Sequence, residues 1–202
     1  MVAEINGADP RVKRTRQLLH HAVLELIHEK AFRHITVQDI ADRATVNRAT
    51  FYAHYEDKFA LMEDCIRDMF WQALDKKLPK ESGWSVQNLR AALLAIFEFL
   101  AYTHGECAPA DREFDPLLQQ LVIGETQALL MRWYQAPNFP GVADGVAPET
   151  VATLCSWAMY GAASQWIQSP RRPPAEQVAD AVVATLTRCL RGAPPVQSLP
   201  VS

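Results

Sequence analysis

Two short helical patterns within residues 36–58 constrain this chain more than any other feature of its sequence. Thr36 is a preferred helix N-cap, and Asp39, three residues later, can return a hydrogen bond to it as in a capping box. Asn47 can cap a second helix, and Val46 and Phe51 have the spacing of a hydrophobic staple around that cap. Two helices joined by so short a turn are typical of a helix-turn-helix.

The second helix of this pattern predicts contact with DNA. If its apolar positions face inward, four side chains near its N-terminus face solvent: Arg48, Ala49, Tyr52 and Ala53. In a helix-turn-helix this end enters the major groove. The guanidinium of Arg48 can pair with a guanine edge, and the methyl group of Ala49 can contact a thymine methyl. The motif therefore indicates sequence reading of double-stranded DNA.

The run VNRATFYAHYEDK, residues 46–58, resembles the recognition segment of TetR-family transcriptional regulators. The resemblance covers about residues 11–71. It implies an all-α homodimer with an N-terminal three-helix DNA-binding domain. A larger C-terminal helical domain would then bind a small-molecule effector and the partner subunit.

The resemblance also implies roles for individual residues. Positions where the family reads bases carry Gln38, Arg48 and Ala49. Positions that usually hold phosphates carry Thr36, Asn47, Thr50, Tyr52, His54 and Lys58. Hydroxyl, amide and ammonium groups suit phosphate oxygens, whereas a planar guanidinium or carboxamide suits a base edge. The two sets are therefore chemically consistent with their implied roles.

Two residues depart from the family pattern. Ala31, after the first helix, and Thr45, in the turn, stand where the family usually has glycine. Both positions are expected to have left-handed backbone, which costs a non-glycine residue on the order of 1 kcal/mol.

Upstream, an amphipathic helix is expected to begin near a cap at Thr15. Its apolar positions have helical spacing: Leu19, Ala22, Val23, Leu26 and Ile27. Four basic residues precede or begin it and form a predicted N-terminal arm: Arg11, Lys13, Arg14 and Arg16. Such an arm either contacts DNA or is a solvated terminus. Residues 11–50 hold eight Lys or Arg against four Asp or Glu in a chain of net charge −3, which favours DNA contact.

Length and pattern predict two domains. A chain of 202 residues with 49% hydrophobic content can build a small DNA-binding domain and a larger helical core. The expected organisation is a flexible arm at 1–10, the DNA-binding domain at 11–71, an effector-binding and dimerisation domain at 72–191, and a flexible tail at 192–202. No strand pattern is present in the sequence. Neither a signal peptide nor a membrane span is indicated, so a cytoplasmic location is expected, on the nucleoid when DNA is bound.

The last two helical segments, about 148–169 and 174–191, are the predicted dimer interface. Their apolar stripes are Val151, Leu154, Cys155, Ala158, Met159 and Ala162 on the first, and Val178, Val182, Leu186, Cys189 and Leu190 on the second. Periodicity alone is equally consistent with a monomer core. Because one helix-turn-helix reads few base pairs, two copies about 34 Å apart on a pseudo-palindromic operator are expected.

An effector pocket can be predicted only from aromatic residues of the C-terminal half: Phe97, Tyr102, Trp133, Trp157 and Trp166. They favour a hydrophobic or aromatic effector, although aromatic residues at helical spacing are more often core. A polar segment holds His104, Cys107, Asp111 and Glu113, whose spacing matches no strong metal-binding motif. No metal and no cofactor are expected.

Three functions are consistent with these patterns. The first is a DNA-binding regulator, a repressor released from its operator by the effector. The second is a redox-responsive regulator with one of four cysteines as its sensor thiol: Cys65, Cys107, Cys155 or Cys189. The third is a helical enzyme with His104 and Cys107 as base and nucleophile, for which no catalytic motif is present. We therefore expect a regulator and not an enzyme.

Overall fold

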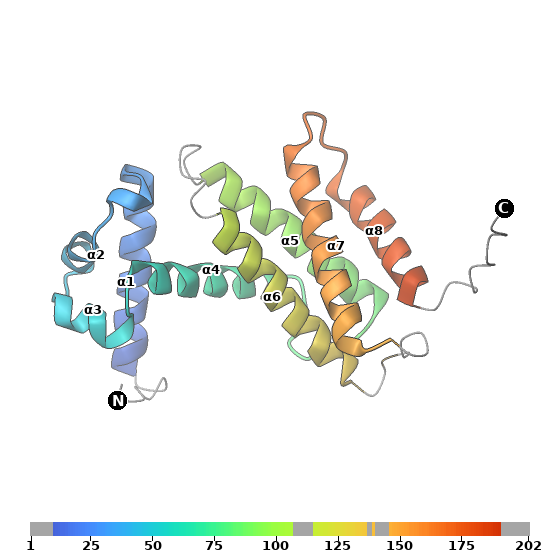
Figure 1. The fold of residues 1–202 in the computed structure, drawn as a ribbon, viewed down its shortest axis with the longest axis horizontal. Helices are drawn as coiled ribbons and strands as arrows, with labels where there is room; N and C mark the ends of the chain where they lie inside the picture. Colours follow the sequence, from blue (N-terminus) through green and yellow to red (C-terminus); the bar gives the residue numbers. More distant parts are fainter. Residues whose placement is uncertain (1–9, 107–114, 137–138, 140–145, 191–202) are drawn as a thin grey trace, which may run out of the picture. The chain divides into compact units, whose positions relative to one another are not determined.

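The computed structural model describes residues 10–106, 115–136, 139 and 146–190. Regular structure in these ranges is entirely helical, as Figure 1 shows, which confirms the all-α prediction. The helices are α1 Pro10–Glu29, α2 Val37–Arg43, α3 Arg48–His54, α4 Lys58–Asp75, α5 Val86–Glu106, α6 Asp115–Tyr134, α7 Pro148–Gln168 and α8 Ala175–Leu190. A 3-10 turn, Phe32–His34, lies between α1 and α2.

The described residues divide into two compact units. The N-terminal unit consists of residues 10–69, 102–106 and 115–121, and the C-terminal unit of residues 70–101, 122–136, 139 and 146–190. The predicted flexible ends, 1–10 and 192–202, lie outside the described residues except for residue 10.

In the N-terminal unit, α2 and α3 lie next to each other beside α1 (Figure 1). The apolar stripe predicted on α1 is buried at Leu19, Ala22, Val23 and Leu26. Ile40 and Ala41 of α2 and Phe51 of α3 are also fully buried. The long α1 and the short α2 and α3 therefore share one small apolar core, because each has its apolar residues on a single face.

The start of α1 corrects the sequence prediction. The helix begins at Pro10 and not near Thr15, whose hydroxyl donates to the carbonyl of Arg11 at 3.0 Å within the helix. Proline is tolerated in a first helical turn because the backbone N–H that it lacks would have no helical partner there. The predicted basic arm of Arg11, Lys13, Arg14 and Arg16 is therefore the first two turns of α1.

The two glycine-replacing residues behave differently. Thr45 has the expected left-handed backbone, with a φ of 55°. The expectation for Ala31 is wrong, because its φ of −55° and ψ of 138° lie in the extended region that any residue adopts. Only the turn between α2 and α3 therefore contains the strain that the sequence suggested for both positions.

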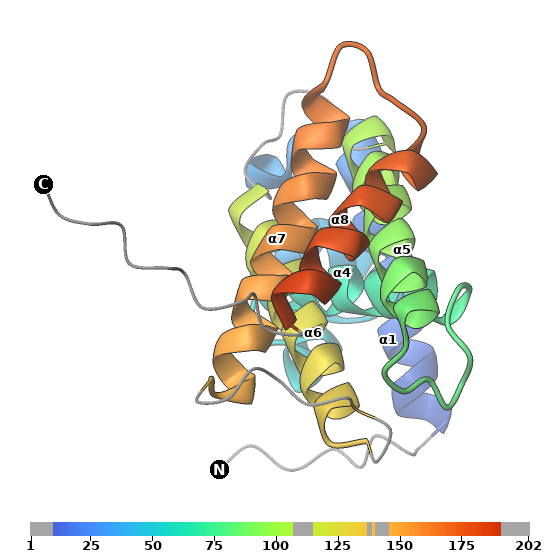
Figure 2. The same cartoon turned by 90° about the vertical axis from the view of Figure 1, so that its right-hand side faces the viewer.

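In the C-terminal unit, α7 and α8 run antiparallel and side by side (Figure 2). Aromatic contacts join segments that are distant in sequence: Phe70 meets Phe99 edge-on at 5.4 Å, and Phe97 stacks on Trp166 at 5.3 Å between ring centroids. Across the described residues, no helix combines the length and apolar character needed to cross a membrane.

Candidate nucleic-acid interface

The start of α2 has the predicted capping box. The hydroxyl of Thr36 accepts from the backbone N–H of Asp39 at 3.1 Å, and the carboxylate of Asp39 accepts from the Thr36 backbone N–H at 2.7 Å. The hydroxyl also donates to that carboxylate at 2.8 Å. Hydrogen bonds from Lys30 and then from Thr36 lower the pKa of Asp39 to about 2, so the box is ionised at neutral pH.

The start of α3 is capped as predicted by Asn47, whose side-chain oxygen accepts from the backbone N–H and hydroxyl of Thr50 at 2.7 and 2.9 Å. The amide nitrogen of Asn47 is therefore the group that remains for a phosphate. Phe51 is fully buried and Tyr55 nearly so. The four residues predicted to face solvent are all exposed: Arg48, Ala49, Tyr52 and Ala53.

Both long base-reading candidates have a partner four residues later on the same helix. On α2, Gln38 Nε2 donates to the carboxylate of Asp42 at 2.7 Å. On α3, an Arg48 guanidinium N–H donates to the hydroxyl of Tyr52 at 3.1 Å, and the guanidinium carbon lies 5.4 Å from the centre of the Tyr52 ring. Each candidate reader thus donates a hydrogen bond to a neighbour one turn along its helix.

Lys58, predicted to bind phosphate, has three backbone partners. Its ammonium group donates to the carbonyls of Phe32 and Ile35 at 2.8 Å each and of Arg33 at 3.3 Å. The same nitrogen lies 4.5 Å from the centre of the Phe32 ring. Lys58 therefore fixes the connection between α1 and α2 to the start of α4. A phosphate contact by the same group remains a prediction.

Asp64 on α4 is the centre of a polar cluster that sequence reasoning missed. Its carboxylate accepts from the Arg16 guanidinium at 2.7 Å, from the Tyr55 hydroxyl at 2.5 Å and from His20 Nε2 at 2.9 Å. These partners come from α1 and from the C-cap of α3. Asp64 therefore joins α1, α3 and α4 through a single carboxylate.

Hydrogen bonding dominates the electrostatics of this cluster. Burial alone would raise the pKa of Asp64, but hydrogen bonds from His20, Tyr55 and Arg16 outweigh it and hold that pKa well below its usual range. Burial and then the bond to Asp64 raise the pKa of Tyr55. The cluster is therefore an ionised carboxylate surrounded by donors. Nearby, burial and then the charge of Arg16 lower the pKa of His54.

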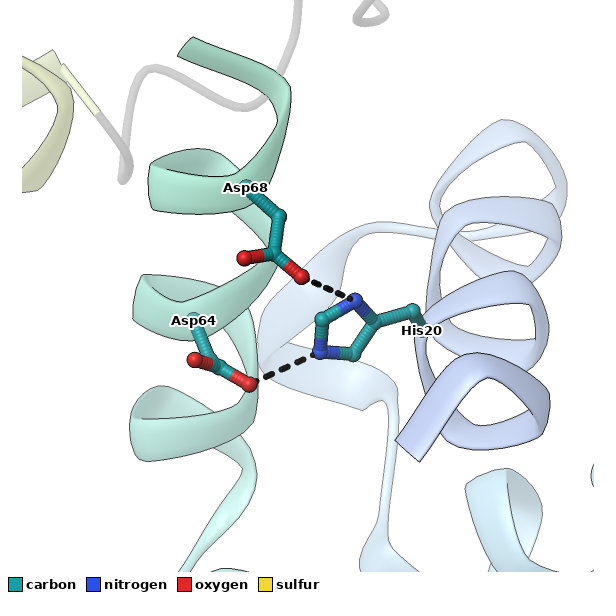
Figure 3. A group of neighbouring side chains, drawn as sticks. All are labelled: His20, Asp64 and Asp68. Carbon is teal, nitrogen blue, oxygen red and sulfur yellow. Dashed lines mark hydrogen bonds and ion pairs between the residues drawn. The ribbon is translucent and has the colours of Figure 1, made fainter. Parts of the chain in front are cut away.

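The His20 ring lies between two carboxylates of α4 (Figure 3). Nε2 faces Asp64, and Nδ1 faces Asp68 at 3.5 Å. Ligand atoms of these three residues lie within 4.8 Å of one another, a spacing that a metal ion could use. However, the carboxylates face different nitrogens of the ring, and Arg16 and Tyr55 already occupy Asp64. The arrangement is that of an ion-pair network.

A second polar contact joins α2 to α1. Arg43 makes a two-pronged ion pair with Glu29, with both N–O distances at 2.8 Å, and its guanidinium reaches Glu25 at 3.3 Å. These residues are largely exposed, so the pair contributes orientation more than stability.

The residues predicted for the effector pocket have different environments. Phe97 and Trp133 are buried, and Trp166 is half-buried with its N–H donated to the carbonyl of Pro173 at 2.8 Å. Tyr102 and Trp157 are 54% and 52% exposed, so they lie outside the buried interior. Tyr102 also belongs to the N-terminal unit. A pocket formed by the remaining three stays a prediction.

Two buried polar atoms of α6 have no hydrogen-bond partner in the described part of the chain: Thr126 Oγ1 and Trp133 Nε1. The residues are seven apart and lie on one face of the helix. Sequence reasoning singled out Trp133 as aromatic but gave no reason to expect an unpaired N–H.

The cysteines of the redox hypothesis fall into two groups. Cys65 and Cys155 are buried. Burial, and then the charges of Asp64 and Asp68, raise the pKa of Cys65, which lowers its thiolate fraction. Cys107 and the side chain of Cys189 lie outside the described residues, as do Asp111 and Glu113. Neither described thiol has the exposure that a sensor requires.

Comparison with known proteins agrees with this geometry. Residues 19–65 match the model for bacterial regulatory proteins of the tetR family. The chain is 46% identical over 48 residues to the HTH-type transcriptional regulator YxbF of Bacillus subtilis, covering 24% of this chain and 13% of that one. It is 33% identical over 97 residues to the regulator YdeS of the same organism, covering 48% of this chain and 47% of that one. Both alignments thus span less than half of the curated relatives.

Solved structures share the fold over nearly the whole chain. The dihydroxyacetone kinase operon activator DhaS aligns with a TM-score of 0.57 and 16% identity, covering 88% of this chain and 96% of that one. The regulator FadR of Bacillus subtilis, in complex with stearoyl-CoA, aligns with a TM-score of 0.52 and 14% identity, covering 86% and 98%. At these identities the likeness shows the fold alone.

A capped helix-turn-helix with an exposed recognition face, on an all-helical chain, defines a helix-turn-helix regulator. The match at residues 19–65 and the two curated relatives show that the N-terminal unit of this chain carries a TetR-type DNA-binding domain, and together with the fold they support a TetR-family transcriptional regulator. The family resemblance seen in the sequence is thereby confirmed.

Proposed function

We propose that this protein is a sequence-specific regulator that binds a pseudo-palindromic operator in double-stranded DNA. One observation carries the proposal: the N-terminal end of a capped α3 exposes Arg48, Ala49, Tyr52 and Ala53 while Phe51 is buried beneath it. A helix held in this way can enter a major groove without rearranging its core. The residues predicted to hold phosphates flank this surface on α2, α3 and α4.

Selection of duplexes from a random DNA pool, followed by anisotropy on the enriched site, tests this proposal. We expect an inverted repeat whose affinity falls steeply with salt, because phosphate contacts release counterions. Arg48→Ala should weaken the enriched site by about 1 to 3 kcal/mol and relax one base position, with little effect on scrambled DNA. Enrichment of no site by folded protein would contradict the proposal.

We further propose a homodimer formed through α7 and α8. The outer face of α7 exposes Leu154 by 65% and Trp157 by 52%, and Ala158 and Gly161 continue this exposed stripe. Val151, Cys155 and Met159, which the sequence suggested for the interface, are instead buried within the protomer. Trp157→Glu should therefore produce monomers in sedimentation and weaken operator binding, whereas Gln87→Glu, at an exposed position of α5 outside the proposed interface, should leave the dimer intact.

An effector that releases the protein from its operator completes the proposal, with the protein acting as a repressor. The buried aromatic residues of the C-terminal unit support a hydrophobic or aromatic ligand, and FadR, of similar fold, was solved with stearoyl-CoA. DhaS is named an activator, so the direction of regulation needs its own measurement. Titrating the protein–operator complex with stearoyl-CoA and with naphthalene, followed by anisotropy, tests release by each class.

A further inference from the structure

We infer that each long base-reading side chain is oriented by a second residue one turn later on its own helix: Asp42 orients Gln38, and Tyr52 orients Arg48. The inference rests on the proposed DNA-binding function and goes beyond it, because it assigns the base that each reader prefers and two residues that set this preference.

The Gln38–Asp42 contact fixes the direction of a side-chain amide. Gln38 Nε2 donates to Asp42 Oδ1 at 2.7 Å. A carboxylate can only accept hydrogen bonds, so the amide nitrogen must face Asp42 and the oxygen must face away from it. Gln38 then offers its oxygen as an acceptor together with its second N–H as a donor. That pair matches the major-groove edge of adenine, with its N6 amino group and N7 acceptor.

The Arg48–Tyr52 contact fixes a guanidinium plane. One N–H donates to the Tyr52 hydroxyl at 3.1 Å, and the guanidinium carbon lies 5.4 Å from the ring centre. The remaining N–H groups of Arg48 can pair with O6 and N7 of guanine. The Tyr52 hydroxyl still has its own proton to donate to a phosphate. Tyr52 therefore connects a phosphate contact to the position of the guanine reader.

The negative charge of Asp42 distinguishes a role in orienting Gln38 from a role in attracting DNA. Its exposed carboxylate lies on the same helix as a base reader, where it repels phosphates and weakens binding to every sequence. A residue that only helped attraction to DNA would have the opposite charge. Removing the Asp42 charge should therefore strengthen binding to DNA in general and weaken discrimination at the base that Gln38 reads.

Selection from a random duplex pool with five proteins tests the inference: wild type, Gln38→Ala, Asp42→Asn, Tyr52→Phe and the double variant Gln38→Ala/Asp42→Asn. Asparagine can donate to or accept from Gln38, so the amide direction is no longer fixed. Phenylalanine keeps the ring beneath Arg48 and its edge contact with Phe51 but removes the hydroxyl. Gln38→Ala alone is the matched control, and thermal melting of each variant confirms folding.

We expect wild type to enrich adenine at one half-site position and guanine at another. Asp42→Asn should reduce the adenine preference about fivefold, the size of one net hydrogen bond, while binding to scrambled DNA becomes tighter. Tyr52→Phe should reduce the guanine preference about fivefold and leave the adenine position unchanged. In the Gln38→Ala background, Asp42→Asn should alter affinity without altering any base preference.

Two results would overturn the inference while the proposed function stands: wild-type base preferences in both single variants, or an equal loss of preference at every position. A wild-type protein that is folded and enriches no motif would overturn both. These outcomes differ in the wild-type measurement, so they cannot be confused.

Discussion

The two compact units are stabilised by different chemistry. In the N-terminal unit, charged side chains join separate helices: Asp64 receives Arg16, His20 and Tyr55, and Lys58 binds three carbonyls. In the C-terminal unit, the described interior is mainly apolar and aromatic, with the hydroxyls of Thr126 and Ser156 as buried polar groups, and ion pairs such as Arg90–Asp180 lie at its surface. Polar contacts depend on direction, whereas apolar burial depends mainly on area.

The difference suits the two proposed tasks. A small unit that presents a recognition helix needs that helix at a defined angle, and directional bonds supply this where the core is small. A larger apolar unit can accommodate a hydrophobic molecule with less loss of stability, because apolar contacts are not directional. All five tryptophans lie in residues assigned to the C-terminal unit, so their fluorescence follows that unit alone.

The largest change in the free energy of unfolding is expected in the C-terminal unit, where apolar packing dominates. Phe97→Ala removes a fully buried ring that stacks on Trp166. The free energy of unfolding of the C-terminal unit should fall by about 3 to 5 kcal/mol. Denaturant titration followed by tryptophan fluorescence measures it. Phe97→Leu, which keeps more of the apolar volume, should lower the free energy of unfolding clearly less. Equal losses in the two variants would show that packing of the Phe97 side chain is not the source of the stability.

Asp64→Asn should have the next largest effect, on the order of 2 kcal/mol, because partly buried donors lose an ionised acceptor. The folded-state pKa of Asp64 is depressed, so its stabilisation is complete above the unfolded-state value of about 3.9 and is lost as the pH falls through the folded value. The variant should therefore be less stable at pH 7 and show a flatter stability profile below about pH 4.

Circular dichroism melts across pH measure the Asp64 variant. Asp68→Asn is its matched control, because Asp68 is about half exposed and faces His20 only at 3.5 Å. A similar loss in both variants would mean that the cluster acts through general charge and not through the bonds to Asp64.

Lys58→Met distinguishes stabilisation from DNA contact. The substitution removes the donor to three carbonyls, so the N-terminal unit should lose about 1 to 2 kcal/mol of stability, and DNA affinity should fall as well. Lys13→Met removes an exposed charge from α1 and should lower DNA affinity at unchanged stability. Melting and anisotropy on both variants provide the comparison. Unchanged melting of the Lys58 variant would leave the lysine with a phosphate role only.

The smallest expected change in stability is an increase. Thr126→Val removes a buried hydroxyl that has no partner in the described residues, so stability should rise by about 1 kcal/mol. Ser156→Ala is the matched control: its hydroxyl is equally buried but donates to the carbonyl of Thr153 at 2.9 Å, so its loss should destabilise. Denaturant titration by fluorescence compares the two. Destabilisation by both changes would show that Thr126 is satisfied in solution.

Local features of this protein were predictable and distant pairings were not. The caps at Thr36 and Asn47 and the outward face of α3 follow from neighbours within one turn, and the structure has them. The pairs Arg16/His20 and Asp64/Asp68 each show as four-residue spacings in the sequence. Their union needs α1 to pack on α4, which no local pattern specifies.

Two failures have equally specific causes. The prediction misplaces the start of α1 because Thr15 resembles an N-cap, whereas the helix begins at Pro10, a residue suited to a first helical turn. The apolar residues assigned to the dimer face on α7 mix two sides of the helix: Val151, Cys155 and Met159 are buried in the protomer, whereas Leu154 and Ala158 are exposed. A helix buried on one side and exposed on the other carries apolar residues on both. Periodicity finds such stripes but does not rank them.

The four-residue spacing of Gln38 with Asp42 and of Arg48 with Tyr52 bears on how operators diverge. Where the residue that meets a base and the residue that aims it are separate, a duplicated regulator can acquire a new target by mutating only the second. Intermediates keep the attraction to DNA and lose only selectivity. Relatives with identical residues at 38 and 48 need not therefore share an operator, and residues 42 and 52 belong in any comparison that assigns one.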